Sequence, residues 1–257
     1  MAEFLIDQAM KEAIDLQNRN QLDDAKSIYN KILAHDKNNS DAYHLLSLIY
    51  LVEGKLDDAR SHIINAIELQ PEISVYHSNY GNILYQSNNL EFAIQEHKRA
   101  IKLNKKNFQS FYSLGVIYSH LKNYDKAVEN YKKALSLDAN SSVAHNNLAN
   151  IYNNINPNEA EHHYLKVLEL TSNDPMPYIN ISNYYLKNTK YKKCVEVLEE
   201  ALNKDVTSKE LYNNLGIAYY ATKDNIAAKK MFKHALEIDN SYKPAIDNIK
   251  NMENAGQ

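Results

Sequence analysis

The feature that most limits how this chain can fold is a repeat of about 34 residues. The segment Ser110–Tyr118 has the sequence SFYSLGVIY, and the segment Glu210–Tyr219 has the related sequence ELYNNLGIAY. A unit this short cannot bury its apolar face alone, so successive units must stack on one another. The repeat therefore predicts an open array of stacked units in place of a single closed core.

Each copy is followed by the same spacing of small and aromatic residues, Ala127-x3-Tyr131-x2-Ala134 in one and Ala228-x3-Phe232-x2-Ala235 in the other. An aromatic residue, Leu-Gly, Tyr, Ala, a second aromatic residue and Ala form the pattern of the tetratricopeptide repeat (TPR). The chain resembles the TPR family over nearly its whole length. The resemblance implies an all-α fold, a right-handed superhelical TPR solenoid built of helix-turn-helix repeats and closed by a capping helix.

The Leu-Gly pair sets the register of a single array over residues 1–257. It predicts seven repeats followed by a C-terminal capping helix, at 6–39, 40–73, 74–107, 108–141, 142–174, 175–208, 209–242 and about 243–254. The first repeat departs most from the pattern, as a terminal repeat does when its outer face meets water. The fifth repeat is one residue short between its two helices, which predicts a local change of twist. Residues 254–257 are expected to form a frayed tail.

Recurring positions predict the contacts between helices. The second helix carries a small residue where neighbouring helices approach closely: Ala25, Ala59, Ala93, Ala127, Ala160, Cys194 and Ala228. A bulky residue four positions later is expected to fill the space between units: Tyr29, Ile63, His97, Tyr131, Tyr164, Leu198 and Phe232. One position of the first helix is occupied by tyrosine in five repeats and by leucine in two: Tyr50, Tyr118, Tyr152, Tyr185, Tyr219, Leu16 and Leu84. Packing therefore accounts for much of the tyrosine content without enzyme chemistry.

Composition excludes several classes of partner. The formal net charge is -3 with no basic block, which argues against nucleic acid as the main partner. The sequence has no apolar run long enough for a membrane span, and its first residues lack the positive and apolar regions of a signal peptide. A single cysteine, Cys194, rules out an intramolecular disulfide and fits a reducing compartment. We therefore expect a cytoplasmic protein, unless a leader has been removed.

The first helix of each repeat lines the concave groove of a TPR superhelix, and here the resemblance implies a row of asparagines along it. Tyr112 interrupts the row, whose members are Asn79, Asn82, Asn147, Asn150, Asn180, Asn183, Asn213 and Asn214. An amide both donates and accepts, so it can bind the backbone of an extended peptide. The row is similar to the superhelical TPR arm of the O-linked N-acetylglucosamine transferases. The alternative is that these amides only satisfy backbone or neighbouring-helix groups.

The second repeat gives the groove a different character. Its exposed positions form an apolar groove patch around His44, Leu45, Leu48, Leu51 and Val52. One interpretation is a pocket for a partner helix or a surface for self-association. The other is that the N-terminal repeat covers this strip with residues such as Met10 and Ile14. Both interpretations stay open from the sequence.

The chemistry of TPR clamps and of enzymes is missing from the pattern. A clamp for a chaperone C-terminal carboxylate needs lysine or arginine at the second, fifth and sixth groove positions, where only Lys11 is basic.

His162 and His163 are adjacent on a helix and point in different directions, and packing explains His77 and His145. His44 and His120 face the groove without a carboxylate partner. Cys194 replaces a buried alanine and should be inert. We expect no catalytic residue, no metal site and no cofactor.

The sequence therefore favours a non-catalytic protein-interaction scaffold, or adaptor, that binds an extended peptide or another partner segment in its concave groove. A second hypothesis is the substrate-recruiting TPR arm of a larger enzyme, such as a glycosyltransferase. A third hypothesis is a homo-oligomeric structural scaffold.

Overall fold

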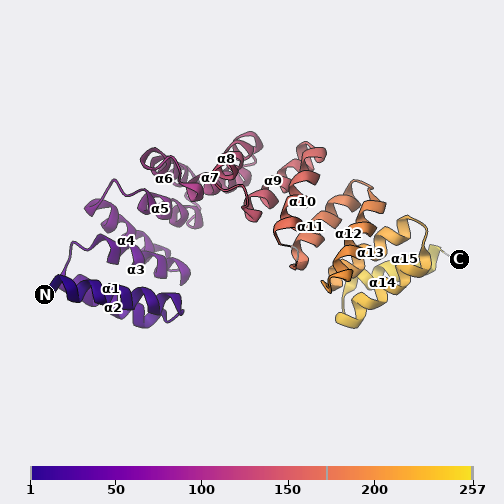
Figure 1. Ribbon diagram of the computed structural model, residues 1–257, viewed down its shortest axis with the longest axis horizontal. Coiled ribbons are helices and arrows are strands. Elements are labelled where there is room, and N and C mark those ends of the chain that lie inside the picture. Colours follow the sequence, from indigo (N-terminus) through magenta and orange to yellow (C-terminus); the bar gives the residue numbers. More distant parts are fainter. Residues whose placement is uncertain (1, 172, 256–257) are drawn as a thin grey trace. The chain divides into compact units, whose positions relative to one another are not determined.

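The computed structural model describes residues 2–171 and 173–255, and over this part the chain forms fifteen α-helices and no strand (Figure 1). The helices are α1 (Ala2–Asn18), α2 (Leu22–His35), α3 (Ser40–Val52), α4 (Leu56–Leu69), α5 (Ser74–Gln86), α6 (Leu90–Leu103), α7 (Phe108–His120), α8 (Tyr124–Leu137), α9 (Ser142–Ile155), α10 (Pro157–Leu170), α11 (Pro175–Lys187), α12 (Tyr191–Asn203), α13 (Lys209–Ala221), α14 (Asn225–Ile238) and α15 (Lys243–Ala255). The all-α prediction is confirmed.

The helices divide into two compact units, an N-terminal unit at Met1–Asp138 and a C-terminal unit at Ala139–Gln257. Within each unit the helices pack as consecutive antiparallel pairs, α1 with α2 through α7 with α8, and α9 with α10 through α13 with α14. Helix α15 packs on α14, and its residues are those predicted to form a capping helix. Residues 254 and 255 belong to this helix, so the frayed tail does not begin where it was expected; residues 256 and 257 lie outside the described part. The handedness and the single continuous array stay predictions.

Side-chain caps mark the starts of many first helices. Asn39, Asn107, Ser141, Asp174 and Ser208 each accept a hydrogen bond from a backbone N–H in the first turn of the helix that follows. These bonds satisfy donors that a helix leaves unpaired at its N-terminus. Local sequence therefore marks where these five pairs begin.

The turn between the two helices of a pair explains the short fifth repeat. In most pairs this turn contains a residue with positive φ, namely Asn20, Gly54, Asn88, Lys122, Thr189 or Lys223. The α9–α10 turn has no such residue: α9 is one residue longer than α7, and Asn156, with φ of -153°, leads directly into Pro157. The residue missing from the fifth repeat is therefore the one that adopts positive φ in the other turns. Proline at the first helical position lets α10 begin directly after Asn156.

The helices of a pair pack by matching a small residue on one to a ring on the other. A Cβ atom added to Gly115 would lie 2.6 Å from the Tyr131 ring, and one added to Gly216 would lie 2.6 Å from the Phe232 ring. The small and bulky series predicted for the second helices are all buried, as contacts between helices require. The Leu-Gly pair thus lets an aromatic ring rest on the backbone of the first helix.

Candidate interaction surface on the first helices

In the N-terminal unit, the first helices of three successive pairs enclose a concavity of about 350 Å³. Its lining comes from α3, α5 and α7: Leu51, Asn82, Tyr85, Gln86, Gln109, Tyr112, Ser113, Val116 and Ile117. Three of the residues predicted for the groove, Leu51, Asn82 and Tyr112, are brought together here. We call this site the first-helix concavity.

The concavity has a rigid polar side and an apolar side. Ser113 Oγ donates to Asn82 Oδ1 at 3.0 Å, and Gln109 Nε2 donates to Ser113 Oγ at 3.2 Å. The Tyr112 ring stacks on Phe108 with centroids 6.1 Å apart. Leu51 and Val116 are half-buried and complete the apolar side. The lining contains no charged side chain.

The asparagines of the predicted row make hydrogen bonds from one repeat to the next. Asn79 Nδ2 lies 2.7 Å from His44 Nε2, and Asn180 Nδ2 donates to Asn146 Oδ1 at 2.9 Å. Their partners lie 35 and 34 residues away, which is one repeat. The alternative interpretation of the row was that its amides form hydrogen bonds with groups on neighbouring helices, and these contacts are of that kind.

In α13 the predicted groove asparagines are buried. Asn213 is 5% exposed and accepts from Asn248 Nδ2 at 2.9 Å, and Asn214 is 7% exposed. Asn214 Nδ2 donates to Ser182 Oγ at 2.9 Å and to Asn183 Oδ1 at 2.8 Å. Burial leaves little of either side chain for a ligand. The two residues stabilise the stacking of α13 on its neighbours.

Other members of the row reach solvent. Asn150 and Asn183 are exposed, and Asn147 is half-buried with interactions of its own. Asn150 Oδ1 accepts from the Tyr164 hydroxyl at 2.7 Å, so its amide group is held in one orientation while it faces outward. The accessible part of the row in the C-terminal unit is therefore Asn147, Asn150 and Asn183, with half-buried Asn180 between them.

The apolar patch of α3 is partly covered, as one of the two sequence interpretations expected. Leu45 packs against a buried cluster that includes Ala13 of α1, and Ala9 and Met10 of α1 pack against the same cluster. Val52 is 75% exposed, whereas Leu48 and Leu51 are half-buried.

His44 was predicted to face the groove, and this prediction is wrong. The side chain is buried, its ring lies 4.8 Å from the Tyr76 ring, and burial lowers its pKa. Its hydrogen bond to Asn79 gives it a role within the fold.

Two histidines that the sequence assigned to packing make specific polar contacts. His77 donates from Nδ1 to Glu96 at 2.6 Å, and its Nε2 lies 2.8 Å from the Pro71 carbonyl oxygen. His145 Nδ1 lies 2.8 Å from His163 Nδ1. In both cases the histidine joins a first helix to its second helix. Over residues 2–171 and 173–255, no cluster of three or more His, Cys, Asp or Glu side chains is arranged to hold a metal ion.

Cys194 fits the prediction of an inert thiol. It is fully buried, and burial raises its pKa to about 12. A thiol with so high a pKa forms almost no thiolate at neutral pH, and the thiolate is the nucleophile. Within the described residues, no helix is both long and apolar enough to cross a membrane.

Family models for the tetratricopeptide repeat match residues 17–78, 108–141 and 209–242, and a TPR repeat model matches residues 81–122. The chain is a tetratricopeptide-repeat protein. Among solved structures, the C-terminal part of a TPR repeat-containing protein from Cytophaga hutchinsonii superposes with a TM-score of 0.71 at 22% identity, covering 93% of this chain and 98% of that one. A likeness at this identity shows the fold alone.

Two curated relatives share part of the TPR sequence. A TPR repeat-containing protein of Methanocaldococcus jannaschii is 30% identical over 103 residues, which is 40% of this chain and 18% of that protein. The human protein O-mannosyl-transferase TMTC1 is 31% identical over 136 residues, which is 51% of this chain and 15% of the transferase. The chain therefore matches less than a fifth of either relative.

Proposed function

We propose that this TPR protein is a non-catalytic adaptor that binds an extended segment of a partner protein on its first-helix face. TPR proteins bind protein or peptide partners in general, and the proposal concerns where and how this one does so. The observation that carries it is the first-helix concavity, in which apolar Leu51, Tyr112 and Val116 lie beside the amides of Asn82 and Gln109.

The chemistry of the lining defines the ligand. An apolar side chain of the partner would contact Tyr112 and Val116, and the side-chain amides would exchange hydrogen bonds with the partner's backbone. Because the lining carries no charge, a charged side chain entering the concavity would lose hydration without gaining an ion pair. We infer a neutral segment with one large apolar residue. In the C-terminal unit, Asn147, Asn150, Asn180 and Asn183 would bind backbone groups of the partner.

The experiment introduces charge without removing packing. Gln86 and Gln109 line the concavity and are exposed, so a Gln86→Glu, Gln109→Glu variant should fold as the wild type does. Affinity capture from the native lysate identifies a partner, and titration calorimetry measures its dissociation constant. We expect the variant to bind at least tenfold more weakly, about 1.4 kcal/mol. A Gln70→Glu, Gln95→Glu variant, with the same charge change outside the concavity, is the control.

A second set of substitutions tests the asparagine row separately. Asn147, Asn150, Asn180 and Asn183 are changed to alanine together, with folding checked by circular dichroism. Partner binding lost from a folded variant would support the row as a ligand site. If both the glutamate variant and this variant bind the partner as tightly as the wild type does, the first-helix face is not the working surface and the proposal is wrong.

The alternative function is a recruiting arm of a larger enzyme, and the specific observation that favours it is the similarity to the transferase TMTC1 over half of this chain. The two functions predict different polypeptides in the cell. An antibody raised against this chain isolates the native polypeptide, and mass spectrometry of that polypeptide shows whether it also carries a catalytic domain. Peptides from a transferase domain on the same polypeptide would favour the arm of an enzyme.

A further inference from the structure

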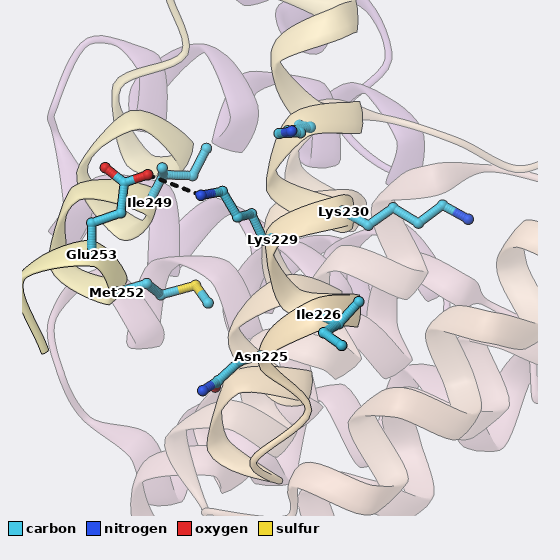
Figure 2. Close-up of a pocket in the computed structure, with 8 residues that line it drawn as sticks. Asn225, Ile226, Lys229, Lys230, Ile249, Met252 and Glu253 are labelled. Atoms are coloured by element: carbon cyan, nitrogen blue, oxygen red, sulfur yellow. Dashed lines mark hydrogen bonds and ion pairs between the residues drawn. The ribbon is translucent and has the colours of Figure 1, made fainter. Parts of the chain in front are cut away.

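A second recess lies between α14 and α15 of the C-terminal unit and has a volume of about 490 Å³. Figure 2 shows Lys229 of α14 reaching to Glu253 of α15, with Ile249 and Met252 projecting from α15 toward α14. The full lining is Asn225, Ile226, Lys229, Lys230, Lys233, Ile249, Met252 and Glu253. We call this site the α14–α15 recess.

At the recess, α15 has Glu253 at the position where five of the seven other first helices have a tyrosine and two have a leucine. In α11 the Tyr185 hydroxyl donates to Glu161, 24 residues earlier on the preceding second helix, at 3.0 Å. In α15 the equivalent contact, between residues that are also 24 apart in the sequence, is the ion pair of Glu253 with Lys229 at 3.0 Å. A glutamate is smaller than a tyrosine, so the space that a ring fills elsewhere is open here.

The first turn of α14 departs from the repeat in a second way. The first residue of the other second helices is apolar, aromatic or proline: Leu22, Leu56, Leu90, Tyr124, Pro157 and Tyr191. The next residue is polar: Asp23, Asp57, Glu91, Asp125, Asn158 and Lys192. Helix α14 begins with Asn225 and Ile226, the reverse order, and Ile226 is 88% exposed.

Folding does not explain this exchange. An acidic residue in the first turn of a helix interacts favourably with the helix dipole, and Ile226 gives up that interaction while burying almost no area. Asn225 in turn leaves open the space that an apolar residue occupies in the other repeats. Ile226 lines the recess together with Ile249 and Met252, and a contiguous apolar surface with a polar rim is the arrangement expected of a site that binds a partner.

The charge around the recess indicates which partner. Three lysines line it, and the single acidic residue, Glu253, is paired with Lys229. Lys230 and Lys233 are exposed, and their spacing of three residues places them on one face of α14. In Figure 2, Lys230 extends from α14 away from α15. The recess therefore presents an apolar floor of Ile249 and Met252 beside Lys230 and Lys233, neither of which forms an ion pair with the residues that the structure describes.

We propose that the α14–α15 recess is a docking site for an acidic segment of a partner protein that carries one aromatic or large aliphatic anchor. The anchor fills the space of the missing tyrosine, against Ile226, Ile249 and Met252. Carboxylates near the anchor pair with Lys230 and Lys233. This site uses a second helix and a basic rim, so it is independent of the uncharged first-helix concavity.

The test selects ligands without assuming a partner. A random 12-residue phage-displayed library is selected on the wild-type chain and depleted on a Lys230→Glu, Lys233→Glu variant. We expect the enriched peptides to carry at least two acidic residues and one aromatic or large aliphatic residue. Synthetic copies should bind the variant at least tenfold more weakly. A Lys98→Glu, Arg99→Glu variant, with the same charge change on exposed residues of α6, should bind as the wild type does.

A Glu253→Tyr variant separates the recess from simple charge attraction. It restores the repeat's tyrosine and removes a negative charge, so charge attraction alone predicts tighter binding of acidic peptides. Filling of the recess predicts binding at least tenfold weaker, which is the result we expect. Tighter binding, or a selection that yields no acidic anchored peptides, overturns the proposal. Dimers of the wild-type chain that dissociate in this variant would assign the recess to a second copy and also overturn it.

Discussion

The sharpest prediction about stability concerns His97, which occupies in α6 the buried position that Tyr131 and Phe232 fill in other pairs. Its ring is fully buried, and burial lowers its pKa to about 4. Its Nδ1 lies 3.4 Å from Ser110 Oγ, and its Nε2 has no hydrogen-bond partner among the residues that the structure describes. The folded chain therefore holds a neutral imidazole at neutral pH.

The lowered pKa makes stability depend on pH with a definite sign. An unfolded histidine has a pKa of about 6.5, so between about pH 6.5 and pH 4 the unfolded state binds more protons than the folded state. Stability falls as pH falls through this window. With a folded pKa of about 4, the loss attributable to His97 is about 2 kcal/mol at pH 5 and about 3 kcal/mol below pH 4.

A His97→Phe substitution should remove this loss. Phenylalanine is a known occupant of the position, since Phe232 packs against Gly216 as His97 packs against Gly81. The substitution also deletes a buried nitrogen without a partner, which should add about 1–3 kcal/mol at pH 7. We therefore expect the variant to be more stable at every pH, with a gap that widens by about 2 kcal/mol between pH 7 and pH 5.

Urea unfolding followed by far-ultraviolet circular dichroism at pH 7, 6 and 5 measures this gap. Part of the pH dependence should remain in the variant, because burial also lowers the pKa of His44. An exposed-histidine variant, His35→Gln, should lose as much stability on acidification as the wild type does. If His97→Phe and the wild type lose stability in parallel from pH 7 to pH 5, burial of a neutral His97 is refuted.

Three further predictions follow from single contacts. Gly115→Val places new atoms against the Tyr131 ring and should cost about 2–3 kcal/mol, so an unchanged urea midpoint would contradict the helix pairing. Asn214→Ala removes two hydrogen bonds from a buried amide and should cost about 1–2 kcal/mol. Asn30→Ala, at an exposed position of α2, should change the stability by less than about 0.5 kcal/mol in the same assay. Cys194 should resist a thiol reagent at pH 8 in the native chain and react fully in urea, and rapid native labelling would show that its burial is wrong.

Much of the fold follows from the sequence because the repeat is local and periodic. The small residue, the ring four positions later and the Leu-Gly pair all act within one helix pair, so a pattern of residues is enough to place them. The same register placed the last helix near 243–254, and α15 spans Lys243–Ala255. The turn chemistry was equally local: the residue missing from the fifth repeat is the one that adopts positive φ elsewhere.

The groove was harder to predict because its contacts join different repeats. The sequence placed the asparagines on the first helices, but whether an amide faces solvent or a neighbour depends on rotamers and on the approach of helices about one repeat apart. Asn180 and Asn214 both occupy the sixth position of their repeats, yet Asn180 is half-buried and Asn214 is buried. The reversed Asn225–Ile226 pair was visible in the sequence and required only comparison with the other second helices.

The structural and ligand-binding interpretations of the asparagine row are compatible, since each amide carries more hydrogen-bonding groups than one contact uses. An asparagine has two N–H donors and an oxygen with two lone pairs, and the contact from Asn180 to Asn146 engages one of its donors. A row held in fixed orientation by such contacts loses little side-chain entropy when a peptide backbone binds to the remaining groups. Stacking of the repeats would then orient the amides in advance, so the same residues stabilise the array and prepare its surface for a partner.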